Sequence, residues 1–205
     1  MTKKIIALFM AVVIMAGIVA GCGKSDNAKS GDNSSGETGD EIVVTIGSEP
    51  KTIDPTLNNA VDGATMIIHA FEGLTKLNEK GEVVAGVAEK WDMSEDGTKF
   101  TFYIREDAKW SDGEPVKAQD FVYSWRRALD PDVGAEYAYQ LYYIKNGQAI
   151  NDGKMPVEEL GVVAKDDKTL EVTLEAPTAY FLELTAFPTL FPLREDAISK
   201  DPDGW

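Results

Sequence analysis

The stretch GVAEKWDMSEDGTKFTFYIREDAKWSDG, residues 86–113, decides the fold class of this chain. Residues 99–105 within it alternate between apolar and polar side chains, a period of two that is typical of a strand with one buried face. The Asp-Gly pair at residues 96–97 favours a tight hairpin turn, which places Trp91 and Met93 on the opposing strand. The apolar face of the second strand consists of Phe100, Phe102 and Ile104. We therefore predict an antiparallel β-hairpin.

Helical and further strand patterns flank this hairpin on both sides. Residues 116–129 carry an apolar stripe, which predicts an amphipathic helix that the Asp-Pro pair at residues 130–131 ends. Its stripe consists of Phe121, Val122, Trp125 and Leu129. The other segments that we expect to be helical are residues 63–74 and 135–150. The further strands that we expect are residues 42–46, 75–77 and 83–88, and a second hairpin of residues 162–165 and 169–174. This pattern predicts a mixed α/β fold.

The composition limits the classes of protein to which the chain can belong. Of its 205 residues, 43% are apolar and 27% are charged, which excludes a wholly disordered chain and a multi-span membrane protein. The net charge of −15 argues against a nucleic-acid partner, because phosphate contacts need clustered Lys and Arg. One cysteine and one histidine exclude an intramolecular disulfide framework, a multi-cysteine zinc site and a His-rich metal site. We predict neither a cofactor nor a bound metal.

Residues 1–21 are typical of a secretory signal peptide. An uncharged apolar run over residues 5–19 follows two lysines, and it is shorter than the ~20 residues that a membrane-spanning helix needs. It ends in small residues directly before Cys22. The sequence VAGC at this point resembles the bacterial lipobox, in which the cysteine is lipidated and becomes the new N-terminus. The alternatives are an uncleaved anchor or an incidental cysteine.

Residues 23–40 read GKSDNAKSGDNSSGETGD and contain no aromatic residue. Such a segment cannot bury apolar surface, so we predict a flexible linker that holds a folded domain away from the membrane.

Adjacent carboxylates offer one route to catalysis. A glycoside hydrolase, for example, needs two carboxylates that face each other across a cleft. The acidic pairs here lie in turns or at strand ends: residues 106–107, 112 and 114, 158–159, and 166–167. This placement favours a solvated acidic surface. We interpret His69, in the first predicted helix, as a structural residue, and we predict that the chain is not an enzyme.

Four tyrosines crowd the helix predicted for residues 135–150, namely Tyr137, Tyr139, Tyr142 and Tyr143. They cannot all face the core. Tyr137 and the hydroxyl groups near it either line a ligand cleft or lie at a wet surface, and the pattern leaves both interpretations open.

Several short blocks then occur in order along the chain. They are EPKTIDP (residues 49–55), FEGL (71–74), GVAEKW (86–91), AKWSDG (108–113), DFVYSWR (120–126), LDP (129–131) and YAYQL (137–141). Together they resemble the extracellular oligopeptide-binding proteins of bacterial ABC importers, a solute-binding class that also includes dipeptide and nickel binders. The resemblance covers residues 41–205.

This resemblance implies a clamshell of the periplasmic-binding-protein type, in its large peptide-binding form, of which only the N-terminal portion is present. It assigns residues 41–71 to the first part of lobe I, 72–194 to a family-specific extra domain and 195–205 to the return into lobe I. Lobe II would lie beyond Trp205.

The resemblance also implies a function and a site. Two lobes would close over an oligopeptide and deliver it to a membrane permease with its ATPase subunits. The loop that touches the peptide backbone falls on Asn59, Ala60 and Val61, and a ligand-facing tyrosine falls on Tyr137. We expect a monomer at the outer face of the cytoplasmic membrane, anchored through lipid on Cys22.

Two alternatives remain at this point. The same fold could bind another solute, such as a nickel chelate or an oligosaccharide. A different class of protein, a secreted surface hydrolase, would use the acidic pairs.

Overall fold

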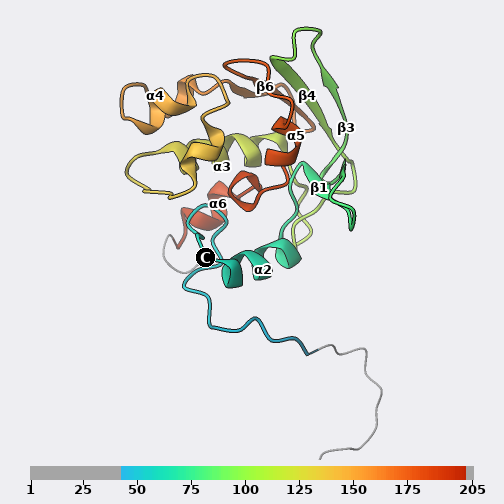
Figure 1. Ribbon diagram of the computed structural model, residues 1–205, viewed down its shortest axis with the longest axis vertical. Helices are drawn as coiled ribbons and strands as arrows, with labels where there is room; N and C mark the ends of the chain where they lie inside the picture. The colour runs from blue at the N-terminus through green and yellow to red at the C-terminus, as the bar shows by residue number, and fades with distance from the viewer. Residues whose placement is uncertain (1–42, 202–205) are drawn as a thin grey trace, which may run out of the picture. The chain divides into compact units, whose positions relative to one another are not determined.

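An antiparallel sheet of four strands contains the hairpin of residues 86–113 in the computed structural model, which describes residues 43–201 (Figure 1). Its strands, in order across the sheet, are β3 (Ala88–Met93), β4 (Lys99–Ile104), β6 (Thr169–Thr173) and β5 (Val162–Ala164). Both predicted hairpins are confirmed. In the first, Trp91 lies opposite Phe102, and Met93 lies opposite Phe100.

Helix α3 (Ala118–Leu129) packs against this sheet and completes the core. The strands that it contacts are β5 and β6, and Figure 1 shows α3 next to the edge of the sheet that carries β6. The predicted apolar stripe is confirmed, since all four of its side chains are buried. They share one core cluster with the inward-facing side chains of the sheet, among them Phe102, Leu170 and Val172.

Shorter elements surround this core. They are α2 (Val61–Ala70), β1 (Thr75–Leu77), β2 (Val83–Ala85), η1 (Ala138–Leu141), α4 (Gly147–Asn151), η2 (Val157–Glu159), α5 (Phe181–Leu184), η3 (Pro188–Leu190) and α6 (Glu195–Ile198). Strands β1 and β2 form a separate antiparallel pair. The helix predicted for residues 63–74 is α2, which ends earlier, at Ala70. The strand predicted for residues 83–88 is divided at Gly86, where a Cβ atom would lie 2.5 Å from the carbonyl oxygen of Gly73.

The continuous helix predicted for residues 135–150 is wrong. This segment forms the short helices η1 and α4, and Asn146 between them has a left-handed φ of 68°. The backbone there bonds to distant residues instead of to itself: Lys145 N–H donates to the Thr173 carbonyl (2.9 Å), and Gly161 N–H donates to the Lys145 carbonyl (2.9 Å). Tertiary hydrogen bonds to the end of β6 thus replace the helical bonds that local propensity favours.

The strand predicted for residues 42–46 is also wrong for the part that the structure describes. Residues 43–46 form no regular element, and Val43 and Val44 are 86% and 73% exposed. A β-branched run becomes a strand only when a neighbouring strand supplies hydrogen bonds, and within residues 43–201 no strand pairs with it.

The predictions for residues 1–40, including lipidation of Cys22, lie outside the described residues. Within the described part of the chain, no helix has the length and apolar character needed to cross a membrane.

The N-terminus of α3 contains half of a capping box. Asp120 Oδ2 accepts hydrogen bonds from the amide of Lys117 (2.9 Å) and from Trp110 Nε1 (3.0 Å), while burial raises the pKa of the Asp120 carboxyl. Lys117 occupies the N-cap, where a reciprocal acceptor belongs. Its ammonium group has no lone pair to offer, and it lies at the positive end of the helix dipole.

Replacing Lys117 with threonine is expected to raise the free energy of unfolding by about 0.5–1 kcal/mol, because the hydroxyl accepts a first-turn N–H bond. The change removes an exposed contact between Lys117 Nζ and Asp167 (3.2 Å), which contributes little. Thermal melts of Lys117→Thr beside Lys117→Ala separate the new cap from the loss of charge. A threonine variant that melts no higher than the wild type contradicts this prediction.

Candidate functional site

A tight loop leads into α2, and Asp54 organises it. The Asp54 carbonyl accepts hydrogen bonds from the amides of Leu57 (3.1 Å) and Asn58 (2.9 Å). Its carboxylate oxygen Oδ1 accepts a third, from the amide of Thr56 (2.8 Å). An aspartate that bonds to its own backbone two residues on is a common turn former, so this sequence locally favours a turn.

Asn58 fixes the last residue before the helix. Its buried side chain donates from Nδ2 to the Ala60 carbonyl (3.0 Å) and accepts from the Ala60 amide at Oδ1 (3.4 Å). The Ala60 carbonyl also accepts the bond from Ala64 N–H that begins α2 (3.0 Å). Asn59, by contrast, is exposed and makes no hydrogen bond within the described part of the chain. Within the described residues, the backbone of Asn59 is therefore free to bond to a ligand, whereas the amide and carbonyl of Ala60 are already bonded.

A small groove of about 180 Å³ lies where this loop meets two distant segments. One wall is the loop with the first turn of α2, and the other is Tyr137 beside the residues that lead into η3. The lining residues are Asn58, Asn59, Ala60, Val61, Ala64, Tyr137, Phe187 and Pro188. All of them are uncharged. The groove thus offers apolar surface and amide groups, and it offers no acid–base pair.

Tyr137 belongs to an aromatic cluster at this groove. Its ring meets that of Phe187 edge to face, with centroids 5.3 Å apart and an angle of 71° between the planes. The ring centroids of Tyr137 and Tyr139 are 5.8 Å apart, so Tyr139 belongs to the same cluster. Tyr139 is 50% exposed, however, and does not line the groove. Of the crowded tyrosines, Tyr137 is therefore held in one orientation by packing against a residue 50 positions away in the sequence.

All four residues predicted to contact ligand, Asn59, Ala60, Val61 and Tyr137, line this one groove. Their role as ligand contacts stays a prediction. Four further residues complete the groove and were not predicted from the sequence: Asn58 and Ala64 beside the loop, and Phe187 and Pro188 on the opposite wall. The signal available for Phe187 and Pro188 was weak, because an apolar residue before a proline is as typical of an ordinary chain turn as of a binding wall.

Gly63 allows the loop to pack on α2. A Cβ atom at this position would lie 2.0 Å from Asn58 Oδ1 and 2.6 Å from the Thr52 carbonyl oxygen. We expect Gly63→Ala to lower the free energy of unfolding by about 1–3 kcal/mol, because the loop must shift to accommodate the methyl group. This loss occurs although alanine favours a helix over glycine by about 1 kcal/mol.

Urea unfolding of Gly63→Ala measures this loss, and Ile68→Ala on the exposed side of the same helix is the control, with an expected change below about 0.5 kcal/mol. A Gly63→Ala variant as stable as the wild type would show that the loop does not need this close contact.

Other candidate groups do not assemble into a site. His69 is exposed, and its Nδ1 lies 2.6 Å from the Thr65 carbonyl oxygen, which agrees with a structural role on the helix. Among the described residues, no group of three or more His, Cys, Asp or Glu side chains could hold a metal ion. Asp107 pairs with Arg105 (3.0 Å), and that arginine holds the pKa of the Asp107 carboxyl below its usual range.

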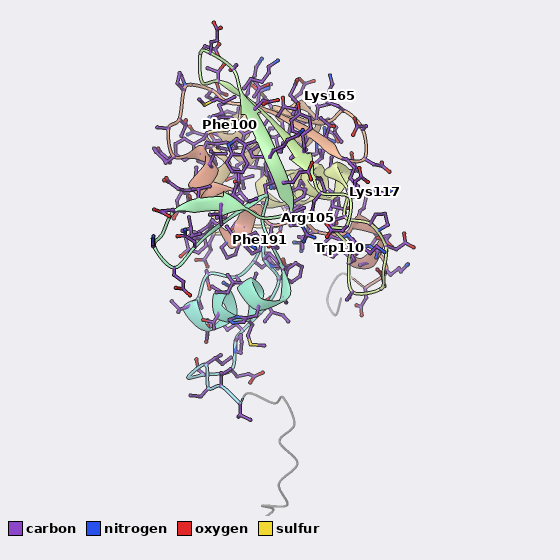
Figure 2. All side chains as sticks on the ribbon, turned by 90° about the vertical axis from the view of Figure 1, so that its right-hand side faces the viewer. Phe100, Arg105, Trp110, Lys117, Lys165 and Phe191 are labelled. Carbon is purple, nitrogen blue, oxygen red and sulfur yellow. The ribbon has the colours of Figure 1, made fainter. Side chains whose placement is uncertain are left out.

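A larger hollow of about 720 Å³ lies beyond the end of α2. Figure 2 labels three of its lining residues, Arg105, Trp110 and Phe191, which gather between β4 and α2. Arg105 forms a salt bridge with Glu72 at its rim (3.0 Å). None of the four predicted contact residues lines this hollow.

The sequence of the chain matches one protein family and several of its characterised members. Residues 82–205 match the sequence profile of the family described as bacterial extracellular solute-binding proteins, family 5 middle. The chain is 41% identical over 200 residues to the oligopeptide-binding protein OppA of Bacillus subtilis. This alignment covers 97% of the chain and 37% of OppA. It is 42% identical over 188 residues to the dipeptide-binding protein DppE of the same organism, and this alignment covers 90% of the chain and 34% of DppE.

Solved structures agree. Haemophilus influenzae OppA in complex with the peptide RPPGFSPFR superposes with a TM-score of 0.76 at 40% identity, over 78% of this chain and 32% of that one. Listeria monocytogenes OppA bound to peptide superposes with a TM-score of 0.71 at 48% identity, over 72% of this chain and 29% of that one. The mixed α/β class is thereby confirmed, and the chain spans about a third of the length of the curated relatives it matches. This chain therefore belongs to the bacterial extracellular solute-binding proteins of family 5.

Proposed function

We propose that this chain is the N-terminal part of the extracytoplasmic substrate-binding component of an ABC importer, and that the ligand is an oligopeptide. The observation that carries the proposal is the groove, which brings Tyr137 to the loop of residues 59–61. Two relatives that share 40–48% identity with the chain were solved with peptide bound.

The chemistry of the groove suits a peptide backbone. Asn59 is exposed and its backbone makes no hydrogen bond within the described residues, so it can pair with an extended ligand as an added strand does, which gives affinity without reading side chains. Uncharged walls accept apolar or small side chains and impose little selection by charge. Closure of a second lobe over this groove would then bury the ligand.

The rest of the layout belongs to the same proposal. Residues 41–71 form the first part of lobe I, 72–194 the extra domain and 195–205 the return into lobe I. Lipid on Cys22 and the linker to residue 40 hold a monomer at the outer face of the cytoplasmic membrane. The partners are a permease and its ATPases, and the chain catalyses no reaction.

One relative favours a second ligand class. The chain is 41% identical over 160 residues to the probable deoxycholate-binding periplasmic protein YgiS of Escherichia coli. An apolar groove would also accept a sterol-like solute. Binding of such a solute on the same fold is the second candidate function.

Isothermal titration of the full-length gene product separates these candidates. The titrants are the peptide RPPGFSPFR, a mixed pool of short peptides, and deoxycholate. We expect a saturable heat with peptide and, by mass spectrometry, peptide that is recovered intact. The 205-residue chain by itself is the control, and it should show no measurable binding because it offers one side of the cleft.

Two results would overturn the peptide proposal. Saturation by deoxycholate with no response to either peptide sample would move the ligand to the second class. Cleavage of the peptide would instead favour a hydrolase.

A further inference from the structure

We infer that Asp54 and Arg127 are positioning residues for ligand binding, because their ion pair fixes the loop wall of the groove to α3. This inference rests on the proposed function, and it concerns two side chains that do not line the groove.

The two side chains form a bidentate ion pair that is almost completely buried. Arg127 Nη1 donates to Asp54 Oδ1 (3.1 Å), and Nη2 donates to Oδ2 (2.8 Å). The exposed fractions of the side chains are 12% for the arginine and 8% for the aspartate. Two parallel charge-assisted bonds fix direction as well as distance, so the carboxylate has a defined place relative to the helix.

The same carboxylate is part of the turn that shapes the loop. Oδ1 accepts both from Arg127 and from the Thr56 amide, and the carbonyl of Asp54 accepts from Leu57 and Asn58. Asn58 in turn holds Ala60. A chain of hydrogen bonds therefore runs from α3 through Asp54 to the loop that carries Asn59 and Val61.

The opposite wall of the groove is fixed to the same helix. Ser124 Oγ donates to the Phe191 carbonyl (2.6 Å), and Trp125 Nε1 donates to the Leu190 carbonyl (2.9 Å). These bonds anchor the segment that begins with Phe187 and Pro188. Helix α3 thus bonds to both walls of the groove, and the ion pair between Arg127 and Asp54 is the contact that joins it to the loop.

Within the described residues, no other hydrogen bond or ion pair joins residues 54–60 to α3. Ser48 Oγ donates to Asp62 (2.7 Å), but that contact is exposed and can exchange with water. Removing one partner of a buried pair also leaves an uncompensated charge, which favours opening of the loop toward solvent. Loss of the pair should therefore loosen the loop and weaken binding, while Tyr137 stays in place.

The neighbouring arginine provides a matched control. Arg126 lies on the same helix turn, but its Nη2 donates to the Glu158 carbonyl (3.0 Å), away from the loop. Arg127→Gln and Arg126→Gln thus remove the same charge from adjacent positions, and only the first releases Asp54.

The test measures two quantities in the full-length gene product. Hydrogen exchange followed by mass spectrometry reports opening of residues 54–63, with β4 as the internal reference for the core. Titration with RPPGFSPFR reports affinity. For Arg127→Gln we expect at least tenfold faster loop exchange and at least tenfold weaker binding, whereas Arg126→Gln stays within about twofold of the wild type.

Two further variants separate positioning from stability. Arg127→Lys keeps the charge but not the bidentate fork, so it should recover part of the affinity. Asp54→Asn/Arg127→Leu leaves no buried charge and keeps an acceptor for Thr56. For this double variant we expect hydrogen exchange in β4 at the wild-type rate. Exchange in residues 54–63 should remain faster than in the wild type, and the affinity for RPPGFSPFR should remain at least tenfold weaker.

The outcomes distinguish this inference from the proposed function. Equal loop exchange and equal affinity in Arg127→Gln and Arg126→Gln would overturn the positioning role, while peptide binding by the wild type stands. A wild type that binds no peptide, with a loop that still opens in Arg127→Gln, would refute the proposed function and leave the structural tether intact.

Discussion

Replacing Trp125 with alanine is expected to lower the free energy of unfolding by about 4 kcal/mol, the largest loss of stability that we predict for a single substitution. The side chain is fully buried, and its ring meets that of Phe121 at 79° with centroids 6.2 Å apart. Truncating a buried aromatic residue costs about 3–5 kcal/mol through lost burial and the cavity that remains. The Leu190 carbonyl also loses its donor, which adds to the cost.

Urea unfolding followed by far-UV circular dichroism measures this loss, because tryptophan fluorescence changes with the substitution itself. Trp91→Ala is the matched control: Trp91 lies on β3, is only partly buried and makes no side-chain hydrogen bond within the described residues. Its cost should be less than half as large. Equal costs for the two substitutions would mean that α3 is not the centre of the core.

The elements that could be predicted from sequence are those whose backbone hydrogen-bond partners are near in the chain. The β3–β4 hairpin follows from strict alternation and an Asp-Gly turn, and α3 follows from one apolar stripe. In both, the period of the side chains matches the local backbone geometry, so burial and local propensity favour the same structure.

The errors occurred where distant backbone groups decide the structure. Residues 135–150 have enough apolar and tyrosine side chains for a helix, but the carbonyl of Thr173 and the amide of Gly161 bond to Lys145. The Asn146-Gly147 pair was an available turn signal, because asparagine tolerates a left-handed φ. A Cβ atom on Gly147 would lie 2.4 Å from the Leu141 carbonyl oxygen, so the break also needs a glycine.

The site shows the same division. Family resemblance selected three loop residues and Tyr137, and the structure places all four at one groove. The pair of Asp54 and Arg127, 73 positions apart, left no sequence pattern, because periodicity reports faces of one element and not contacts between elements. Aspartate before proline is as typical of a surface turn as of a buried ion pair.

Replacing Tyr137 with alanine is expected to weaken binding of RPPGFSPFR to the full-length gene product by about 10–100-fold. Rigid aromatic side chains in a packed pocket dominate binding energy, and loss of such a contact commonly costs about 1.4–2.8 kcal/mol, which equals that range of affinity. Because Phe187 holds the Tyr137 ring edge to face, the ring is ordered before ligand arrives, and little conformational entropy is lost on binding.

Tyr139→Ala is the control for this experiment, since Tyr139 belongs to the same aromatic cluster but lies outside the groove. Its affinity should remain within about threefold of the wild type, and Tyr137→Phe, which keeps the ring and its contact with Phe187, should remain within about fivefold. Equal losses in Tyr137→Ala and Tyr139→Ala would show that the aromatic cluster acts through stability alone. An unchanged affinity in Tyr137→Ala would remove this residue from the site, and the ligand would then have to be held by the loop of residues 59–61 without an aromatic wall.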